Sequence, residues 1–147
     1  MMQPIKGLAM TFDMDKLINC LSMGLSSHIV ITGSKMDIEQ LQIDLKGRLA
    51  RDGKSTRELL CTTESLELNQ CEQVDFLLVK GLGNLPAQHN NSCAIRTYLD
   101  MGTYNKLRSI IFCETEHYEK HFNDYNAPFY RFCLDYPLGN EKTLSTK

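Results

Sequence analysis

The chain has 147 residues, 42% of them hydrophobic, and a formal net charge of −2. That length suits one domain built around a single core. The near-neutral charge excludes a general attraction to nucleic acid or to an anionic membrane, so any such contact must depend on a local patch. No apolar run reaches the roughly 20 residues of a membrane span, and no export signal opens the chain. We therefore expect a soluble protein that makes no membrane contact.

The first predicted element is a helix that precedes any strand. Residues 1–12 contain Pro4 and Gly7, which argue against regular structure, and we expect an N-terminal extension there. From residue 13 the apolar side chains recur at helical spacing, at Met14, Leu17, Ile18, Leu21 and Leu25. Next, "HIVITG" at 28–33 predicts a β-strand, because a β-branched run is stopped by glycine. Ser34 then caps a helix that ends at "RDG".

The rest of the chain continues this alternation. We expect strands at 57–63, 74–81, 109–115 and 129–136, and helices at 64–73, 93–106 and 116–125. Five strands that alternate with helices predict an α/β fold, a three-layer sandwich with a mainly parallel five-stranded sheet. We expect one domain over residues 13–138 and a flexible tail at 139–147.

Six cysteines form no C-x-x-C pair, and several lie in apolar runs such as "LLC", "IIFC" and "RFC". Small secreted scaffolds place cysteines in polar loops, whereas buried free thiols are typical of a reducing compartment. We therefore expect free thiols and a cytoplasmic protein, or a nuclear one if the source is eukaryotic.

The segment "FLLVKGLGNLP" at 76–86 is an apolar strand that ends on a Gly-x-Gly turn, and a helix and the strand "SIIFCET" follow it. In this order of elements the run from about Leu17 to Tyr136 resembles a P-loop NTPase core. It is most similar to the AAA+ module of bacterial helicase loaders of the DnaC and DnaI kind, and a RecA-like paralogue is similar as well. The resemblance implies an acidic pair after the third strand and a polar sensor residue after the fourth.

The chain departs from that family where the chemistry would be. A Walker A loop, GxxxxGK[ST], wraps backbone N–H groups around the phosphates. Here Gly33, Ser34 and Lys35 follow the first strand directly, so no loop residues remain to form the cradle. Asp37 and Glu39 would also repel phosphate.

The acidic pair that the resemblance implies after the third strand is also missing. Lys80 and Gly81 stand at the expected acidic pair, and a lysine cannot hold magnesium. Asp75 lies at the start of its strand, whereas ligands of open α/β sheets bind beyond the carboxyl ends. Glu114 stands at the sensor position, where its simplest interpretation is a solvated carboxylate. We therefore expect no catalytic residues, no cofactor and no ATP hydrolysis. Response-regulator receivers are an alternative fold, but the acidic pair and the phosphoacceptor aspartate that they need are also absent.

Cys113, His117 and His121 fall at four-residue intervals, a spacing that a zinc site could use. Cys113 is expected to face the core of a strand, and one further ligand would still be needed. We therefore interpret both histidines as ordinary helix-surface residues and expect no metal site.

Two segments could contact partners. Five cations within twelve residues could bind a phosphate backbone or an acidic protein: Lys46, Arg48, Arg51, Lys54 and Arg57. The alternative is that they only complement a helix C-terminus. An aromatic run would mark a protein interface if its strand lies at a sheet edge, or belong to the core if a loop covers it; its candidate residues are Phe129, Tyr130, Phe132 and Tyr136.

These features favour a non-catalytic, NTPase-like scaffold that binds protein partners as a hetero-oligomer or homodimer. The resemblance alone implies a replication or recombination machine. The alternatives are a nucleic-acid-binding accessory protein that uses the basic segment 46–57, a residual nucleotide binder that uses Lys35 and Glu114, and a pseudo-receiver signalling domain.

Overall fold

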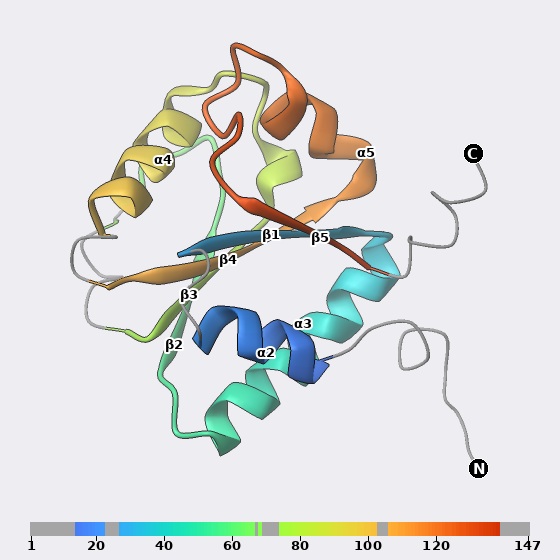
Figure 1. Cartoon of the computed structure of the whole chain (residues 1–147). Helices are drawn as coiled ribbons and strands as arrows, with labels where there is room; N and C mark the ends of the chain where they lie inside the picture. The colour runs from blue at the N-terminus through green and yellow to red at the C-terminus, as the bar shows by residue number, and fades with distance from the viewer. Residues whose placement is uncertain (1–13, 23–26, 67, 69–73, 103–105, 139–147) are drawn as a thin grey trace.

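A computed structural model describes residues 14–22, 27–66, 68, 74–102 and 106–138 of the chain. Its five strands form one parallel sheet in the order β2-β3-β4-β1-β5, and helices cover both faces (Figure 1). The predicted α/β three-layer class is therefore confirmed. Receiver-type sheets have the order 2-1-3-4-5, so the pseudo-receiver alternative is wrong. The predicted extension at 1–12 and tail at 139–147 lie outside the described residues.

The strands are β1 (His28–Gly33), β2 (Thr56–Leu60), β3 (Phe76–Lys80), β4 (Arg108–Glu114) and β5 (Leu134–Pro137). β1 pairs with β4 on one side and with β5 on the other, and β3 joins β4 to the edge strand β2. The inner strands are continuously apolar because both of their faces are covered, whereas β2 is mostly exposed.

Helices α2 (Met14–Ser22) and α3 (Lys35–Arg51) cover one face of the sheet, and α4 (Asn90–Gly102) and α5 (Thr115–Tyr118) cover the other (Figure 1). A short 3₁₀ turn, η3 (Leu82–Asn84), follows β3, and a π-helical turn, η5 (Glu119–Asn123), continues α5. No helix in the described part of the chain is both long and apolar enough to cross a bilayer.

Alternation along the strands divides the buried residues into two cores. In β1, Ile29 and Ile31 pack with the α2 and α3 side chains, while Val30 packs with α4 and α5. Successive side chains of a strand point to opposite faces, so each inner strand supplies both cores. Burial on both faces is what fixes the register of this sheet.

Helix α3 follows β1 without an intervening loop. The Ser34 Oγ accepts a hydrogen bond from the Asp37 N–H at 3.1 Å, which is the expected N-cap contact. The helix faces the sheet with four fully buried residues at helical spacing, Ile38, Leu41, Leu45 and Leu49. Beyond the helix the chain turns at Gly53, whose φ is +77, in the left-handed region that favours glycine.

Two predicted elements differ from the structure. Of the strand predicted at 129–136, only residues 134–136 pair with the sheet, and residues 124–133 form successive turns. Asp124 starts these turns by accepting the Asn126 and Ala127 amides, a contact typical of Asp in turns. Of the helix predicted at 64–73, residues 64–66 and 68 are not α-helical, and the others lie outside the described residues. Asn91 donates to the carbonyls of Thr62 and Glu64, which ties the start of this segment to α4.

Candidate functional site

The strand order places a crevice at one end of the sheet. The connection after β1 runs through α3 toward β2, whereas the connection after the neighbouring strand β4 runs through α5 toward β5 on the other side. Because these two helices leave on opposite faces of the sheet (Figure 1), the carboxyl ends of β1 and β4 form a topological switch point. Ligands of open α/β sheets bind at such points.

A cavity of about 230 Å³ lies at this carboxyl end of the sheet, beside the ends of β3 and β4. It collects residues from the ends of β3 and β4, from the first turns of α3 and from η3, and its polar lining residues are Lys35, Gln42, Lys80, Asn84, Glu114 and His117. Four of the positions singled out in the sequence, Lys35, Lys80, Gly81 and Glu114, are therefore brought together. Gly33 and Ser34 lie next to the crevice in the chain but do not line it.

The start of α3 does not fit a nucleotide phosphate. The Asp37 amide, one of the donors that such a site would use, is already bonded to the Ser34 hydroxyl. The end of β1 is also covered, because a Cβ on Gly33 would lie 3.1 Å from the Leu138 Cβ. The Leu138 amide donates to the Thr32 carbonyl at 2.7 Å, which fixes this cover.

The end of β3 does not fit a magnesium ion. Lys80 Nζ lies 3.0 Å from Glu58 Oε1, and Lys46 Nζ lies 2.6 Å from the other oxygen of the same carboxylate. The hydrogen bonds from Lys46 and then Lys80 lower the pKa of Glu58. Asp75 lies at the amino end of β3 and accepts the Ser55 amide at 2.8 Å, far along the strand from the crevice.

A carboxylate and imidazole cluster does lie at the crevice, at the start of α5. His117 Nε2 is 3.5 Å from Glu114 Oε1 and 3.4 Å from Glu116 Oε2. The ligand-type atoms of these three residues all lie within 4.8 Å of one another. Glu114 and His117 also line the cavity. We name Glu114, Glu116 and His117 the α5 cluster. Of its members, the sequence prediction held Glu114 to be a solvated carboxylate and His117 a surface residue, and it did not single out Glu116.

Cys113 and His121, whose spacing with His117 was weighed as a zinc site and set aside, do not join His117 in the group of ligand-type atoms. Burial raises the pKa of the Cys113 thiol to about 12, which keeps it from acting as a thiolate ligand. The prediction that His121 is a surface histidine is wrong, because its side chain is fully buried. Burial, followed by the charge of Lys120, lowers the pKa of His121 to about 4.

The basic segment is partly neutralised within the fold. Lys46 pairs with Glu58, and Arg48 pairs with Asp15 at 2.8 Å and with Asp52 at 3.2 Å. The remaining candidates Arg51, Lys54 and Arg57 are exposed and form no ion pair with any other described residue. The five cations therefore do not act as one continuous charged patch.

The aromatic run packs partly against the two cores, and its strand β5 lies at an edge of the sheet, which was the condition set for a protein interface. Phe129 is fully buried. Phe132 stacks on His28 with ring centroids 4.8 Å apart, and the Arg96 guanidinium lies 4.3 Å from the centre of the same ring. Tyr130 and Tyr136 are half-buried. The turns at 124–133 carry Phe129 and Phe132 onto Phe122 of η5 and Arg96 of α4.

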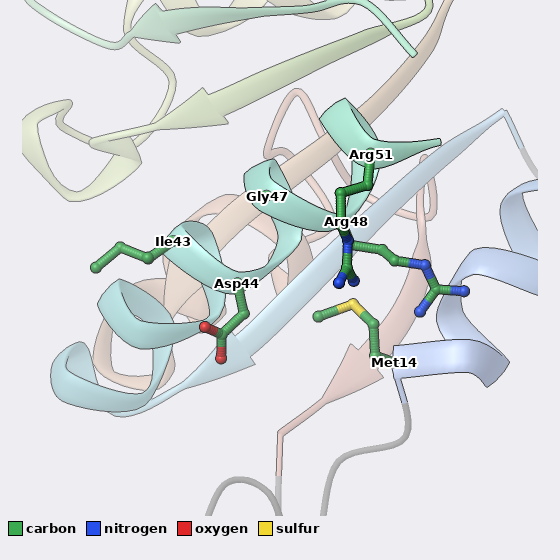
Figure 2. A pocket seen from close by; sticks show the side chains of 6 residues that line it. All are labelled: Met14, Ile43, Asp44, Gly47, Arg48 and Arg51. Atoms are coloured by element: carbon green, nitrogen blue, oxygen red, sulfur yellow. The ribbon is translucent and has the colours of Figure 1, made fainter. Parts of the chain in front are cut away.

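A groove on α3 was missed at the sequence level. It encloses about 660 Å³ and is lined by Met14, Ile43, Asp44, Gly47, Arg48 and Arg51, as Figure 2 shows. We name these residues the α3 groove. The Ile43 side chain is 67% exposed, and Gly47 adds no side chain to fill the space beside it. The core positions of α3 at 38, 41, 45 and 49 leave Ile43 on the outer face, so a helical-wheel projection could have revealed it.

No protein-family model matches the chain, and no curated protein sequence matches it.

Proposed function

We propose that this chain is a non-catalytic scaffold with an NTPase-like fold, and that it binds a protein partner through the α3 groove. The observation that carries the proposal is the groove itself, in which the exposed Ile43 lies on the same helix as Arg51 (Figure 2). Large apolar side chains exposed beside unpaired charge are typical of a contact surface.

We infer the absence of catalysis from the residues at the positions where an NTPase binds nucleotide and magnesium. The Ser34 cap occupies the helix start, Leu138 covers the end of β1, and Lys80 is bound to Glu58. The resemblance to P-loop NTPases is supported by the convergence of Lys35, Lys80 and Glu114 on one crevice. A fold of this kind can be retained as a scaffold after its chemistry is lost, since fold and function are separable.

The chemistry of the groove indicates what kind of partner it would accept. Arg48 is fixed by Asp15 and Asp52, which leaves Arg51 as the groove cation that can pair with a partner carboxylate. Met14 and Ile43 supply the apolar surface. A protein segment with an apolar anchor beside an acidic residue would match both, and the chain would then function as part of a hetero-oligomer or homodimer.

The nucleic-acid alternative rests on Arg51, Lys54 and Arg57. Each phosphate contact contributes a salt-dependent term to binding, and the ion pairing of Lys46 and Arg48 reduces the number of such contacts that the segment can make. A replication or recombination machine and a cytoplasmic or nuclear location follow from the resemblance and the composition, and both belong to the proposal.

The test is affinity purification of the tagged chain at native expression levels, with and without nuclease. We expect a protein partner that co-purifies in stoichiometric amount, survives nuclease, and is lost from the double variant Ile43→Glu and Arg51→Glu. The matched control is Met101→Glu on α4, because Met101 is 65% exposed and lies outside the groove. Capture that depends on nucleic acid, or capture equal in both variants, would refute the proposed surface.

A second measurement tests the lost nucleotide site. Ligand at one hundred times its dissociation constant should stabilise a folded protein by about 2.7 kcal/mol. We expect no shift in Tm with millimolar ATP, ADP or GTP. A clear shift that disappears in Lys35→Ala would instead support the residual nucleotide binder.

A further inference from the structure

We propose that the α5 cluster binds a divalent first-row transition-metal ion, with Glu114, Glu116 and His117 as ligands. This site is separate from the magnesium position of the NTPase family, which falls at the ends of β1 and β3. The inference also does not depend on the α3 groove or on the proposed partner.

The spacing of the donor atoms suits such an ion. Zinc binds imidazole nitrogen and carboxylate oxygen at about 2.0–2.2 Å, and two ligands at tetrahedral angles then lie about 3.4 Å apart. The imidazole nitrogen of His117 is 3.4 Å from one carboxylate and 3.5 Å from the other. The two nitrogen–oxygen distances therefore already match those between the ligands of a tetrahedral ion. Only the distance between the oxygens of Glu114 and Glu116 would have to change on binding.

The local fold explains why these three residues converge. Glu114 ends β4 in extended conformation and Thr115 begins α5, so residues 114 and 117 face the same side one turn apart. The His117 ring packs closely against Gly83 of η3, where a Cβ would lie 2.5 Å from Nε2. This contact holds the imidazole in place, as supporting groups do around metal ligands.

The charges of the cluster are not balanced by a fixed cation. Neither Glu114 nor Glu116 pairs with a lysine or arginine anywhere in the described ranges of the chain; His117 is their partner. A neutral imidazole carries a single N–H, so Nε2 can donate to only one of the two carboxylates at a time. A divalent ion would bind both oxygens and the nitrogen together.

The surroundings supply a second, independent observation. His121 lies one helical turn beyond His117, its side chain is fully buried, and neither of its ring nitrogens has a hydrogen-bond partner among the described residues. An unpartnered buried polar group is rare in a folded protein, and this one lies four residues from His117 along the same helical segment.

The donor set selects the class of metal. Calcium takes six to eight oxygens and magnesium retains most of its water, whereas imidazole with carboxylates suits Zn²⁺, Co²⁺ or Ni²⁺. Three protein ligands leave at least one coordination position for water or an external ligand. Because Glu114 and His117 line the cavity, that cavity offers room for such a ligand.

The test is titration of the metal-free chain with ZnCl₂ by calorimetry and with CoCl₂ by visible absorption. We expect one bound ion per chain, and Co²⁺ bands of nitrogen and oxygen ligation without thiolate charge transfer. Glu116→Gln should weaken binding at least about tenfold, and it should leave the fold intact because the Glu116 side chain is 76% exposed. Glu39→Gln, an exposed change on α3, is the matched control and should bind like the unmodified chain.

A second variant probes the geometry without removing a ligand. Gly83→Ala would place a methyl group 2.4 Å from the His117 Cδ2 atom and displace the ring, so binding should again weaken about tenfold or more. The proposal is overturned if Zn²⁺ does not bind, if Glu116→Gln and Gly83→Ala both bind as tightly as the control, or if the Co²⁺ spectrum shows thiolate ligation.

Discussion

Acidification should destabilise this protein through His28, a buried histidine at the start of β1. Its side chain is only 4% exposed, and its Nδ1 lies 2.7 Å from the Ser109 Oγ. Burial lowers the pKa of His28 from 6.5 to about 4, although a hydrogen bond with the Leu99 carbonyl and the charge of Asp100 offset part of that effect. The folded state therefore resists protonation of a ring that the unfolded chain protonates freely.

The size and the pH window follow from this shift. Above the unfolded pKa of 6.5 both states carry a neutral ring, so the full stability is present. As pH falls below 6.5 the unfolded chain takes up the proton first, and stability is lost down to the folded pKa of about 4. The loss at pH 5 is about 2 kcal/mol for this one group.

The assay is urea unfolding at pH 7 and pH 5 for the natural chain and for His28→Gln. The variant should be less stable at pH 7, because it loses the ring stacked on Phe132. The decrease in its free energy of unfolding from pH 7 to pH 5 should nevertheless be about 2 kcal/mol smaller than that of the natural chain. Met101→Gln is the control, because it changes an exposed side chain on α4 and no histidine, and it should keep the full pH dependence.

His121 contributes acid sensitivity of its own, because its pKa is also lowered to about 4. For this reason the decisive quantity is the difference between the natural chain and His28→Gln, rather than the total loss. Equal pH dependence in both proteins would refute the reasoning, since it would mean that the His28 ring can be protonated in the fold without cost.

Three further predictions concern stability and are measured as the free energy of unfolding in urea. Ser34→Ala should cost about 1 kcal/mol through loss of the α3 cap. Gly81→Ala should destabilise the protein more than Gly53→Ala. Both glycines have a positive φ, a conformation that costs an alanine about 1–2 kcal/mol. Of the two, only Gly81 would also place a Cβ within 3 Å of a neighbour, at 2.7 Å from the Leu60 Cδ1 atom. Leu77→Ala should cost about 2–5 kcal/mol, because Leu77 is fully buried in β3. An effect below about 0.5 kcal/mol in any of the three would contradict the contact on which it rests.

The elements that were predicted well are those in which local signals agree. The strand at 28–33 is found at the predicted residues, because a β-branched run is followed at once by a capping serine. The central residues of the buried strands are apolar, at 76–79 in β3 and 110–113 in β4. Strand order could not be read in this way, since the direction of each crossover is decided by packing between distant segments.

The C-terminal aromatic run shows where local signals compete. Aromatic residues favour strands. The same stretch also contains Asp124, Asn126 and Pro128, which are residue types that favour turns. Turns prevailed because Phe129 reaches the core from them, where it packs on Phe122 with ring centroids 5.4 Å apart. Burial of a large side chain outweighs a propensity that is worth only about 1 kcal/mol across its whole scale.

The candidate site was predictable to the extent that parallel strands end at a common edge. Lys80 and Glu114 are the last residues of their strands and Lys35 lies two residues after β1, and they meet at the crevice for that reason. The participation of Glu116 and His117 could not be inferred, because it depends on α5 starting immediately after β4 and on Gly83 leaving space for the imidazole ring.

Different residues of helix α3 line the crevice and the α3 groove. The first turn of α3 supplies Lys35 to the crevice, and its last turns supply Gly47, Arg48 and Arg51 to the groove. The buried residues Ile38, Leu41, Leu45 and Leu49 anchor this helix to the sheet along its length. The lining residues of the crevice and of the groove do not overlap. Metal binding and partner binding should therefore be independent, because the anchored helix is the one described element that contributes to both surfaces.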